Sequence, residues 1–219
     1  MEGPDSLHDG TITRIEPQAR RKSRLSIFLD GEFAFGLNAE VVLRHALKPG
    51  DVLPVALQER LLFEEDSKGA LTRAFALLGR RALTEHELRS KLKALEFHEQ
   101  IVDRVVARCR ELGYLDDEKF AHDFIRAQLA RRPLGSERLR LALRRKGVPA
   151  NLIEVVLAEA VPAGSTSLVE AAAQKFLARR GGTLPAPKLR QRLTDHLRRA
   201  GFSWEEIQNA LAWPDEQGD

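Results

Sequence analysis

An internal repeat places the strongest constraint on what this chain can fold into. Three segments align without a gap, from Leu88 with "LRSKLKALEFHEQIVDRVV", from Leu139 with "LRLALRRKGVPANLIEVVL" and from Leu193 with "LTDHLRRAGFSWEEIQNAL". The copies start 51 and 54 residues apart, which is enough for three short helices in each unit. Five equivalent positions are apolar in all three copies: Leu88, Leu139 and Leu193; Leu92, Leu143 and Leu197; Phe97, Val148 and Phe202; Val102, Ile153 and Ile207; Val106, Leu157 and Leu211. The sequence therefore predicts tandem three-helix repeats.

The repeats also carry signals for where their helices end and begin. A basic pair follows the leucine stripe of two copies, where positive charge offsets the negative pole of the helix dipole. Gly147 and Gly201 come next, and glycine adopts the left-handed conformation that ends many helices. Ser203 and Glu206 then form a capping box for the following helix. Apolar residues flank three such starts: Phe202 and Ile207 around Ser203, Leu83 and Leu88 around Thr84, and Leu115 and Phe120 around Asp116, which follows Gly113. A weaker first helix precedes each pair, in "GALTRAFALLGRRA", "DDEKFAHDFIRAQLARR" and "SLVEAAAQKFLARR".

The first 65 residues have a different pattern. "TITRIE" and "RLSIFLDGEFAFGL" alternate apolar and polar positions, and Asp30-Gly31 between two such runs predicts a hairpin turn. Asn38 is placed to cap a short helix, and Lys48-Pro49-Gly50-Asp51 predicts a turn. The predicted fold is mainly α, with a small strand-rich N-terminal domain. The predicted divisions are residues 1–65 for that domain, 66–115, 116–161 and 164–213 for the three repeats, and 214–219 for an acidic tail.

Composition excludes several classes of protein. No apolar run approaches the roughly 20 residues that a membrane span needs, and the start "MEGPDSLHDG" is acidic rather than a signal peptide, so we expect a cytoplasmic protein. The single cysteine, Cys109, cannot form an internal disulfide. It falls on one apolar helix side with Val102, Val105 and Leu112, which predicts a buried, structural thiol.

The sequence shows no catalytic, metal or cofactor signature. The six histidines are scattered without ligand spacing, and there is no P-loop, no GxGxxG after a strand and no GxSxG. Asp116-Asp117 follows a glycine stop, so we interpret the pair as a helix start rather than as part of a metal-dependent nuclease. For Trp204 and Trp213 we expect core or edge packing rather than stacking with bases. We predict a protein that is not an enzyme and has no catalytic residues, metal or cofactor.

Positive charge is concentrated in one part of the chain. Residues 120–200 hold 16 Lys and Arg against 6 Asp and Glu, whereas the whole chain has a net charge of only +3. Such a segment is a candidate surface for phosphates or for an acidic protein, and arginine makes two hydrogen bonds at once to either group. The candidate binding residues are Arg138, Arg140, Arg144, Arg145, Lys146, Arg179, Arg180, Arg190, Arg192, Arg198 and Arg199.

The order of motifs resembles a known family. "RAFALLGRRALTEHELRSKL", then "ELGYLDDEKFAHDFI", then "LGSERLRLALRRKGV" are similar to successive repeats of RecX, the bacterial regulator of the RecA recombinase, and the resemblance covers roughly residues 68–213. It implies a curved array of three-helix repeats without a catalytic centre. It also implies a protein that lodges in the groove of the RecA–DNA filament and restrains its growth, ATP hydrolysis, strand exchange and coprotease activity. The third repeat departs from the pattern, because "RRGGTLPAPK" adds a loop between its first two helices.

Two binding hypotheses follow. The first is a module that bridges subunits of a RecA nucleoprotein filament, and the second is a direct DNA-binding protein of helix-turn-helix-like type. Three tandem units of nearly equal spacing suit a repeating filament, whereas a sequence-specific reader usually needs one recognition helix and dimer symmetry. We therefore favour the filament, with weak binding to single- and double-stranded DNA, no membrane association and, since no heptad seam is present, a monomer.

Overall fold

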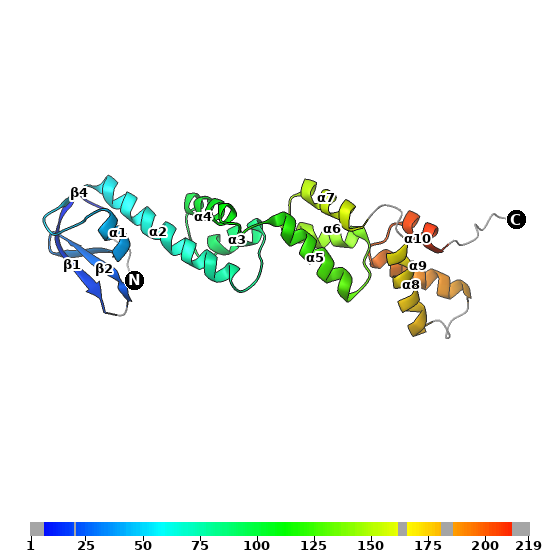
Figure 1. Ribbon diagram of the computed structural model, residues 1–219. Helices are drawn as coiled ribbons and strands as arrows, with labels where there is room; N and C mark the ends of the chain where they lie inside the picture. The colour runs from blue at the N-terminus through cyan, green and yellow to red at the C-terminus, as the bar shows by residue number, and fades with distance from the viewer. Residues whose placement is uncertain (1–6, 20, 162–165, 181–185, 212–219) are drawn as a thin grey trace. The chain divides into compact units, whose positions relative to one another are not determined.

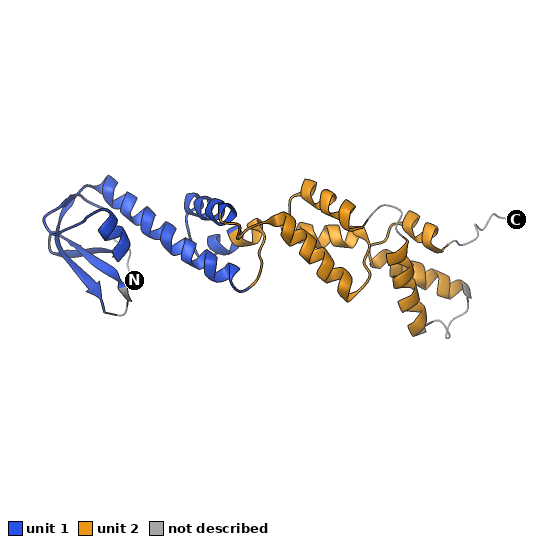
Figure 2. Cartoon of the chain, viewed as in Figure 1, with its two compact units in different colours: residues 1–80, 89–111 blue, residues 81–88, 112–219 orange. Residues whose placement is uncertain are grey.

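The computed structural model describes residues 7–19, 21–161, 166–180 and 186–211 (Figure 1). The chain forms two compact units, one of residues 1–80 and 89–111 and the other of residues 81–88 and 112–219 (Figure 2). The described residues hold ten helices and four strands, and the last strand ends at Leu53. None of these helices combines the length and the apolar content that a bilayer span requires.

The first unit begins with an antiparallel sheet. Its strands are β1 (Gly10–Gln18), β2 (Arg21–Leu29), β3 (Glu32–Asn38) and β4 (Val52–Leu53), in the spatial order β3-β2-β1-β4. The predicted hairpin is confirmed, because Asp30 and Gly31 both have positive φ between β2 and β3. The predicted Asn38 cap is confirmed too, since its side chain accepts a hydrogen bond from the Glu40 amide at the start of α1 (Ala39–Arg44).

Helix α2 (Val55–Leu78) connects the sheet to the first repeat. It continues without a break through residues 65 and 66, where the sequence suggested a boundary between domains. The N-terminal half of α2 escaped prediction because two of its buried positions are polar. Gln58 donates hydrogen bonds to the carbonyl oxygens of His8 and Leu53, and Glu65 forms an ion pair of 3.0 Å with Arg24. These partners come from the sheet and from His8 just before it, so the helix pattern is not apolar there.

Two further helices complete the first repeat: α3 (Glu85–Lys93) and α4 (Glu99–Glu111). Helix α4 packs on α2. The prediction of a buried thiol is confirmed, because Cys109 on α4 is fully buried. Leu112, expected on the same buried side, is 43% exposed, because it lies beyond the last residue of α4.

The second unit contains two complete three-helix repeats. The first consists of α5 (Asp117–Arg131), α6 (Ser136–Arg145) and α7 (Ala150–Ala160), and the second of α8 (Ser167–Arg180), α9 (Ala186–Arg199) and α10 (Trp204–Leu211). Each repeat has its own apolar core. The equivalent positions of the sequence repeat provide these cores: Leu139, Leu143, Val148, Ile153 and Leu157 in one, and Leu193, Leu197, Phe202 and Ile207 in the other, with Leu211 packed against it.

The predicted helix caps are present. Ser203 and Glu206 satisfy each other's backbone amides, and the Asp116 carboxylate accepts a hydrogen bond from the Lys119 amide. Thr84 accepts from the Glu87 amide, although the Glu87 carboxylate has other partners. Gly113, Gly147 and Gly201 have the expected left-handed conformation.

Of the core or edge packing expected for Trp204, the core is excluded. Trp204 is 53% exposed at the first position of α10, whereas Phe202, before the Ser203 cap, is buried in the core. Trp213 lies outside the described residues.

Successive helix pairs in the second unit dock through a recurring contact. The amide of Gly135, before α6, donates to the Ala200 carbonyl in the turn after α9, over 3.0 Å. In the same way the Thr84 hydroxyl donates to the Lys146 carbonyl in the turn after α6, over 2.6 Å. The aligned repeats place Thr84 opposite Gly135 and Lys146 opposite Ala200, so one mode of docking is used twice.

Candidate anion-binding site

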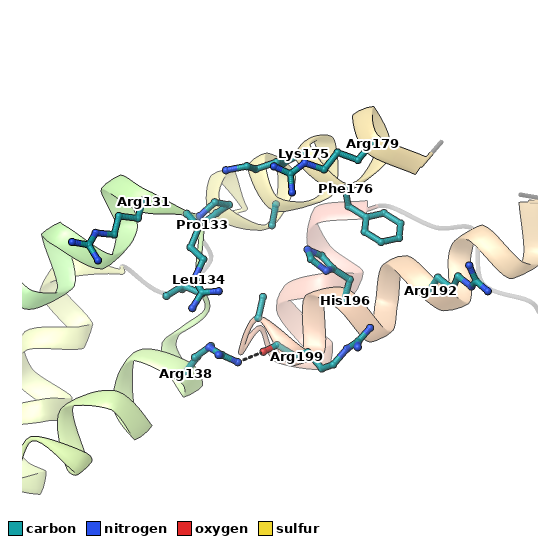
Figure 3. Close-up of a pocket in the computed structure, with 13 residues that line it drawn as sticks. Arg131, Pro133, Leu134, Arg138, Lys175, Phe176, Arg179, Arg192, His196 and Arg199 are labelled. Carbon is teal, nitrogen blue, oxygen red and sulfur yellow. Dashed lines mark hydrogen bonds between the residues drawn. The ribbon is translucent and has the colours of Figure 1, made fainter. Parts of the chain in front are cut away.

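A cavity of about 920 Å³ lies within the second unit, and its lining is strongly basic (Figure 3). Seven cationic side chains line it, and the described lining residues include no aspartate or glutamate. We call this site the large basic cavity. Its lining residues are Arg131, Arg132, Pro133, Leu134, Arg138, Ala172, Lys175, Phe176, Arg179, Arg192, His196, Arg199 and Ala200.

The end of α5 supplies one wall of the large basic cavity. Arg132 has extended backbone angles (φ −163°, ψ 148°), as expected for a residue before proline, so α5 stops at Arg131. Leu134 then inserts into the core of the α5–α7 repeat and fixes the position of this turn. Arg131 and Arg132 are left exposed at the rim.

Helices α8 and α9 supply the opposite walls, and each presents one face. Ala172, Phe176 and Arg179 recur at helical spacing along α8, with Lys175 beside them. Arg192, His196 and Arg199 recur at the same spacing along α9 (Figure 3). The two helices pack together through the core below, so their charged edges lie on either side of the cavity.

Arg138 links the two repeats at the cavity. Its guanidinium donates to the Arg199 carbonyl over 2.9 Å (Figure 3). That carbonyl belongs to the last residue of α9, where a positive charge stabilises the negative end of the helix dipole. Arg138 thereby holds the start of α6 against the end of α9 while it remains exposed to the cavity.

The electrostatics of the cavity favour an anion. The seven cationic side chains have no ion pair with a carboxylate among the described residues. Burial lowers the pKa of His196, and the positive charges of Arg199 and Arg179 lower it further. These cations have no carboxylate partner in the described part of the chain and disfavour the protonation of His196. Such a cluster attracts negative charge.

An aromatic pair lies between the cationic rims. The rings of Phe176 on α8 and His196 on α9 face each other with centroids 4.9 Å apart and an interplanar angle of 34° (Figure 3). Both side chains are half-buried, and Phe176 also packs on the core of its repeat. The cavity therefore offers apolar ring surface together with positive charge.

A second cavity, of about 280 Å³, adjoins the first and shares Arg132, Leu134 and Arg138 with it. We call it the small basic cavity. Its lining residues are Phe124, Gln128, Arg132, Leu134, Arg138, Leu139, Leu141, Ala142 and Arg145.

The structure brings together five of the predicted binding residues and separates others. Arg138, Arg179, Arg192 and Arg199 line the large basic cavity, and Arg145 lines the small one. Arg144 and Arg198 are exposed but line neither cavity. Each repeated basic pair is therefore split, because its second arginine lines a cavity and its first does not. Arg180 ends α8, and its side chain lies outside the described residues.

Two predicted residues form ion pairs within the molecule, and a third is half-buried. Arg140 binds both oxygens of the Glu154 carboxylate, at 2.7 and 2.8 Å, and also contacts Glu137 at 2.5 Å. Lys146 donates to Glu87 over 2.9 Å. Arg190 is half-buried on α9. The sequence predicted that Arg140 faces a binding partner. In the structure its guanidinium binds Glu154 of α7 instead.

Sequence reasoning missed several residues of the site: Arg131, Arg132, Lys175, Phe176 and His196. The arginine pair before Pro133 was a visible signal, since a helix must end there. Phe176 and His196 belong to helices whose pairing no local pattern reveals. In the described parts of the chain, no group of three or more His, Cys, Asp or Glu side chains is arranged to hold a metal ion.

Family models match three parts of this chain. They are the regulatory protein RecX N-terminal domain at residues 10–53, the first three-helix domain of RecX at 70–109 and the second at 116–157. The strand-rich region, to which the sequence repeats assigned no family, is thus matched as well. The regulatory protein RecX of Leuconostoc citreum is 32% identical over 90% of this chain and 74% of its own length. That of Clostridium acetobutylicum is 29% identical over 94% of this chain and 96% of its own length.

Solved structures agree with these matches. A crystal structure of a regulatory protein RecX, 25% identical, superposes with a TM-score of 0.73 over 93% of this chain and 100% of its own. The fold of RecX from Lactobacillus salivarius is also similar, with a TM-score of 0.62 at 22% identity over 68% of this chain and 96% of that one. The repeats, the strand-rich N-terminal sheet and these relatives lead to one conclusion: this chain belongs to the RecX family of regulatory proteins.

Proposed function

We propose that this protein is a non-enzymatic, cytoplasmic modulator of the RecA recombinase. It binds the RecA–DNA filament and restrains filament growth, ATP hydrolysis, strand exchange and coprotease activity. The observation that carries the proposal is the large basic cavity, in which seven cations without a described carboxylate surround apolar ring surface. A nucleoprotein filament presents both phosphates and acidic protein groups, which are the partners that exposed arginines bind best. Membership of a family of regulatory proteins supports control rather than turnover.

The test measures DNA-dependent ATP hydrolysis and strand exchange by RecA with and without the purified full-length protein. We expect the wild type to inhibit both reactions. Arg179→Ala with Arg192→Ala removes two charges from opposite walls of the large basic cavity and should relieve the inhibition. The matched control is Lys119→Ala with Arg126→Ala, which removes two exposed charges of α5 that line neither cavity.

The outcomes separate the alternatives. A wild type that leaves RecA unaffected contradicts the proposal. Equal inhibition by both double variants removes the large basic cavity from the mechanism. If the cavity variant loses affinity for bare DNA and for RecA filaments to the same extent, the protein is mainly a direct DNA binder. A selective loss of affinity for filaments identifies RecA as the partner.

A further inference from the structure

The two basic cavities are the same site in successive repeats. Arg145 in the small cavity and Arg199 in the large one are 54 residues apart and occupy equivalent positions at the ends of α6 and α9. Ala142 and His196, one helical turn earlier, are equivalent in the same way. Each cavity thus lies on the first two helices of its repeat, and the large one is bounded in addition by residues 131–134 and 138 of the preceding repeat.

The first helices agree with this equivalence. Alignment of "ARR" at the ends of α5 and α8 places Phe124 opposite Ala172 and Gln128 opposite Phe176. All four residues line their respective cavities. The cavities therefore use equivalent positions of successive repeats, although their phenylalanines, Phe124 and Phe176, stand at different ones, and they adjoin through the shared Arg132 and Arg138.

Each cavity combines arginine with an aromatic ring. In the small cavity, Phe124 contributes its ring, which stacks on Phe120 with centroids 6.1 Å apart and an interplanar angle of 13°. In the large cavity, the ring surface comes from Phe176 and His196. Arginine forks suit phosphodiester oxygens, and aromatic rings suit the faces of unstacked bases. Duplex DNA exposes phosphates but keeps its base faces stacked, so a single strand alone offers both partners.

We propose that the small and large basic cavities bind consecutive stretches of one single strand of nucleic acid, with phosphates at the arginines and unpaired bases on the aromatic rings. Arg145 and Arg199 hold phosphates at the two cavities, and Arg132 and Arg138 bind the backbone between them. Phe124 and Phe176 contact bases. The inference rests on the proposed function, because it names the ligand of the same surface.

The first repeat lacks the arginines of these cavities, so we place the single strand on the second and third repeats. Where the later repeats have Arg145 and Arg199, the first has Ala94. Where they have Arg138 and Arg192, it has Glu87, whose carboxylate is paired with Arg81 and Lys146 and cannot bind phosphate. The second and third repeats therefore carry the binding determinants.

The experiment measures binding of labelled oligo(dT) to the full-length protein by fluorescence anisotropy without RecA. An abasic strand of equal length and a duplex of equal length are the comparison ligands. We expect oligo(dT) to bind at least about fivefold tighter than the abasic strand, since one stacked base contributes roughly this factor or more. Duplex should also bind more weakly than oligo(dT). Equal affinity for all three ligands would contradict the proposed contacts between unpaired bases and the aromatic rings.

Two arginine variants separate a built site from general charge. Arg145→Ala with Arg199→Ala should reduce the affinity for oligo(dT) by on the order of tenfold and lower the salt slope by about 1.4, since each phosphate contact on a single strand contributes about 0.7. Arg144→Ala with Arg198→Ala removes the same charge one residue earlier in each pair and should have a clearly smaller effect. Equal losses in the two variants would overturn the assignment to the cavities.

A third variant tests the aromatic surface. Phe176→Leu keeps an apolar side chain against the core and should weaken oligo(dT) about fivefold while the abasic strand binds as before. Phe124→Leu provides the same test in the small cavity if Phe176→Leu does not fold. Weakening of both ligands alike, or displacement of oligo(dT) by equimolar thymidine triphosphate, would overturn the proposal. RecA inhibition that persists in a variant unable to bind oligo(dT) would contradict the functional role of the cavities without contradicting their ligand.

Discussion

Gly147 lies directly against His86, so closely that a Cβ added to the glycine would overlap the histidine side chain. Gly147 also has a φ of +76°, a backbone conformation that residues other than glycine rarely adopt. The equivalent Gly201 is similarly close to Arg138, with a φ of +93°. The glycine after each second helix therefore has two roles: it ends that helix and lets the start of another helix dock on the turn.

Replacement of Gly147 should reveal both roles. Gly113 is the matched control, because it has a φ of +74° but no atom near the place of a Cβ. Gly113→Ala should cost about 1 kcal/mol of unfolding free energy from backbone strain alone. Gly147→Ala should cost at least about 1 kcal/mol more, because its Cβ would also overlap the His86 side chain. Urea denaturation of the full-length variants measures both effects, and equal losses would show that the contact adds nothing to stability.

Glu87 is a second element of the same junction. Burial opposes its ionisation, but hydrogen bonds and positive charge from Arg81 and Lys146 prevail and lower the pKa of Glu87 to about 2. Because the folded pKa lies below the ordinary value, the stabilisation is present above about pH 4.5 and is lost as the pH falls toward 2. Glu87→Gln should therefore cost on the order of 1–3 kcal/mol near pH 7.

The stability difference between wild type and Glu87→Gln should shrink steadily below pH 4.5. Urea titrations at several pH values provide the measurement. Glu118→Gln, an exposed change on α5, is the control and should behave like the wild type. A difference that stays constant down to pH 2 would exclude the carboxylate charge as its source.

His196 should make ligand binding depend on pH. The pKa of His196 is lowered by burial and by Arg199 and Arg179, so the free protein holds this ring neutral near pH 7. The other charged groups among the described lining residues are all cationic: Arg131, Arg132, Arg138, Lys175 and Arg192. A bound phosphate would offset their repulsion and raise the pKa of His196, so affinity for oligo(dT) should increase as the pH falls below neutral.

The variant His196→Gln should flatten this pH profile while it retains most of the affinity at pH 8. Anisotropy titrations between pH 5.5 and 8 compare the two proteins. In the absence of ligand the sign is opposite: a lowered histidine pKa means that the folded state loses stability as the pH falls below about 6.5. An identical pH dependence in both proteins would assign it to another group.

Cys109 should report on unfolding of the first unit. The thiol is fully buried, and burial raises its pKa, so the reactive thiolate is scarce in the folded protein. We expect a thiol reagent such as dithionitrobenzoate to react slowly with the native protein and at once in denaturant. Rapid reaction under native conditions would show that α4 opens locally far more often than its burial suggests.

Residues 66–219 should fold without the N-terminal sheet. The buried cluster of the sheet comprises residues from Ile12 to Leu61, so a cut before Asp66 leaves that cluster whole on the removed side. The truncation shortens α2 but keeps Ala70 and Ala74, its buried positions in the later half. Circular dichroism and thermal melting should show a helical, cooperative protein. Loss of the transition would mean that the sheet and the first half of α2 stabilise the repeats.

The sequence alone determined the repeats, their caps and the hairpin. Each of these features depends on neighbours within a few residues: leucines four apart, Ser203 with Glu206, or Asp30 with Gly31. Because such interactions are local, the same short pattern produces the same geometry wherever the segment lies in the fold.

Only the tertiary structure decided what the arginines do. Arg140 and Arg145 lie in the same short helix, yet one is held by Glu154 of α7 and the other lines a cavity. The large basic cavity exists because α5, α8 and α9 meet, and Phe176 and His196 come together from two successive helices. Likewise, α2 extends back to Val55 because the Gln58 side chain donates a hydrogen bond to the Leu53 carbonyl of β4. These outcomes depend on which helix faces pack together, and that choice is made by burial and charge across long sequence separations, which no local pattern encodes.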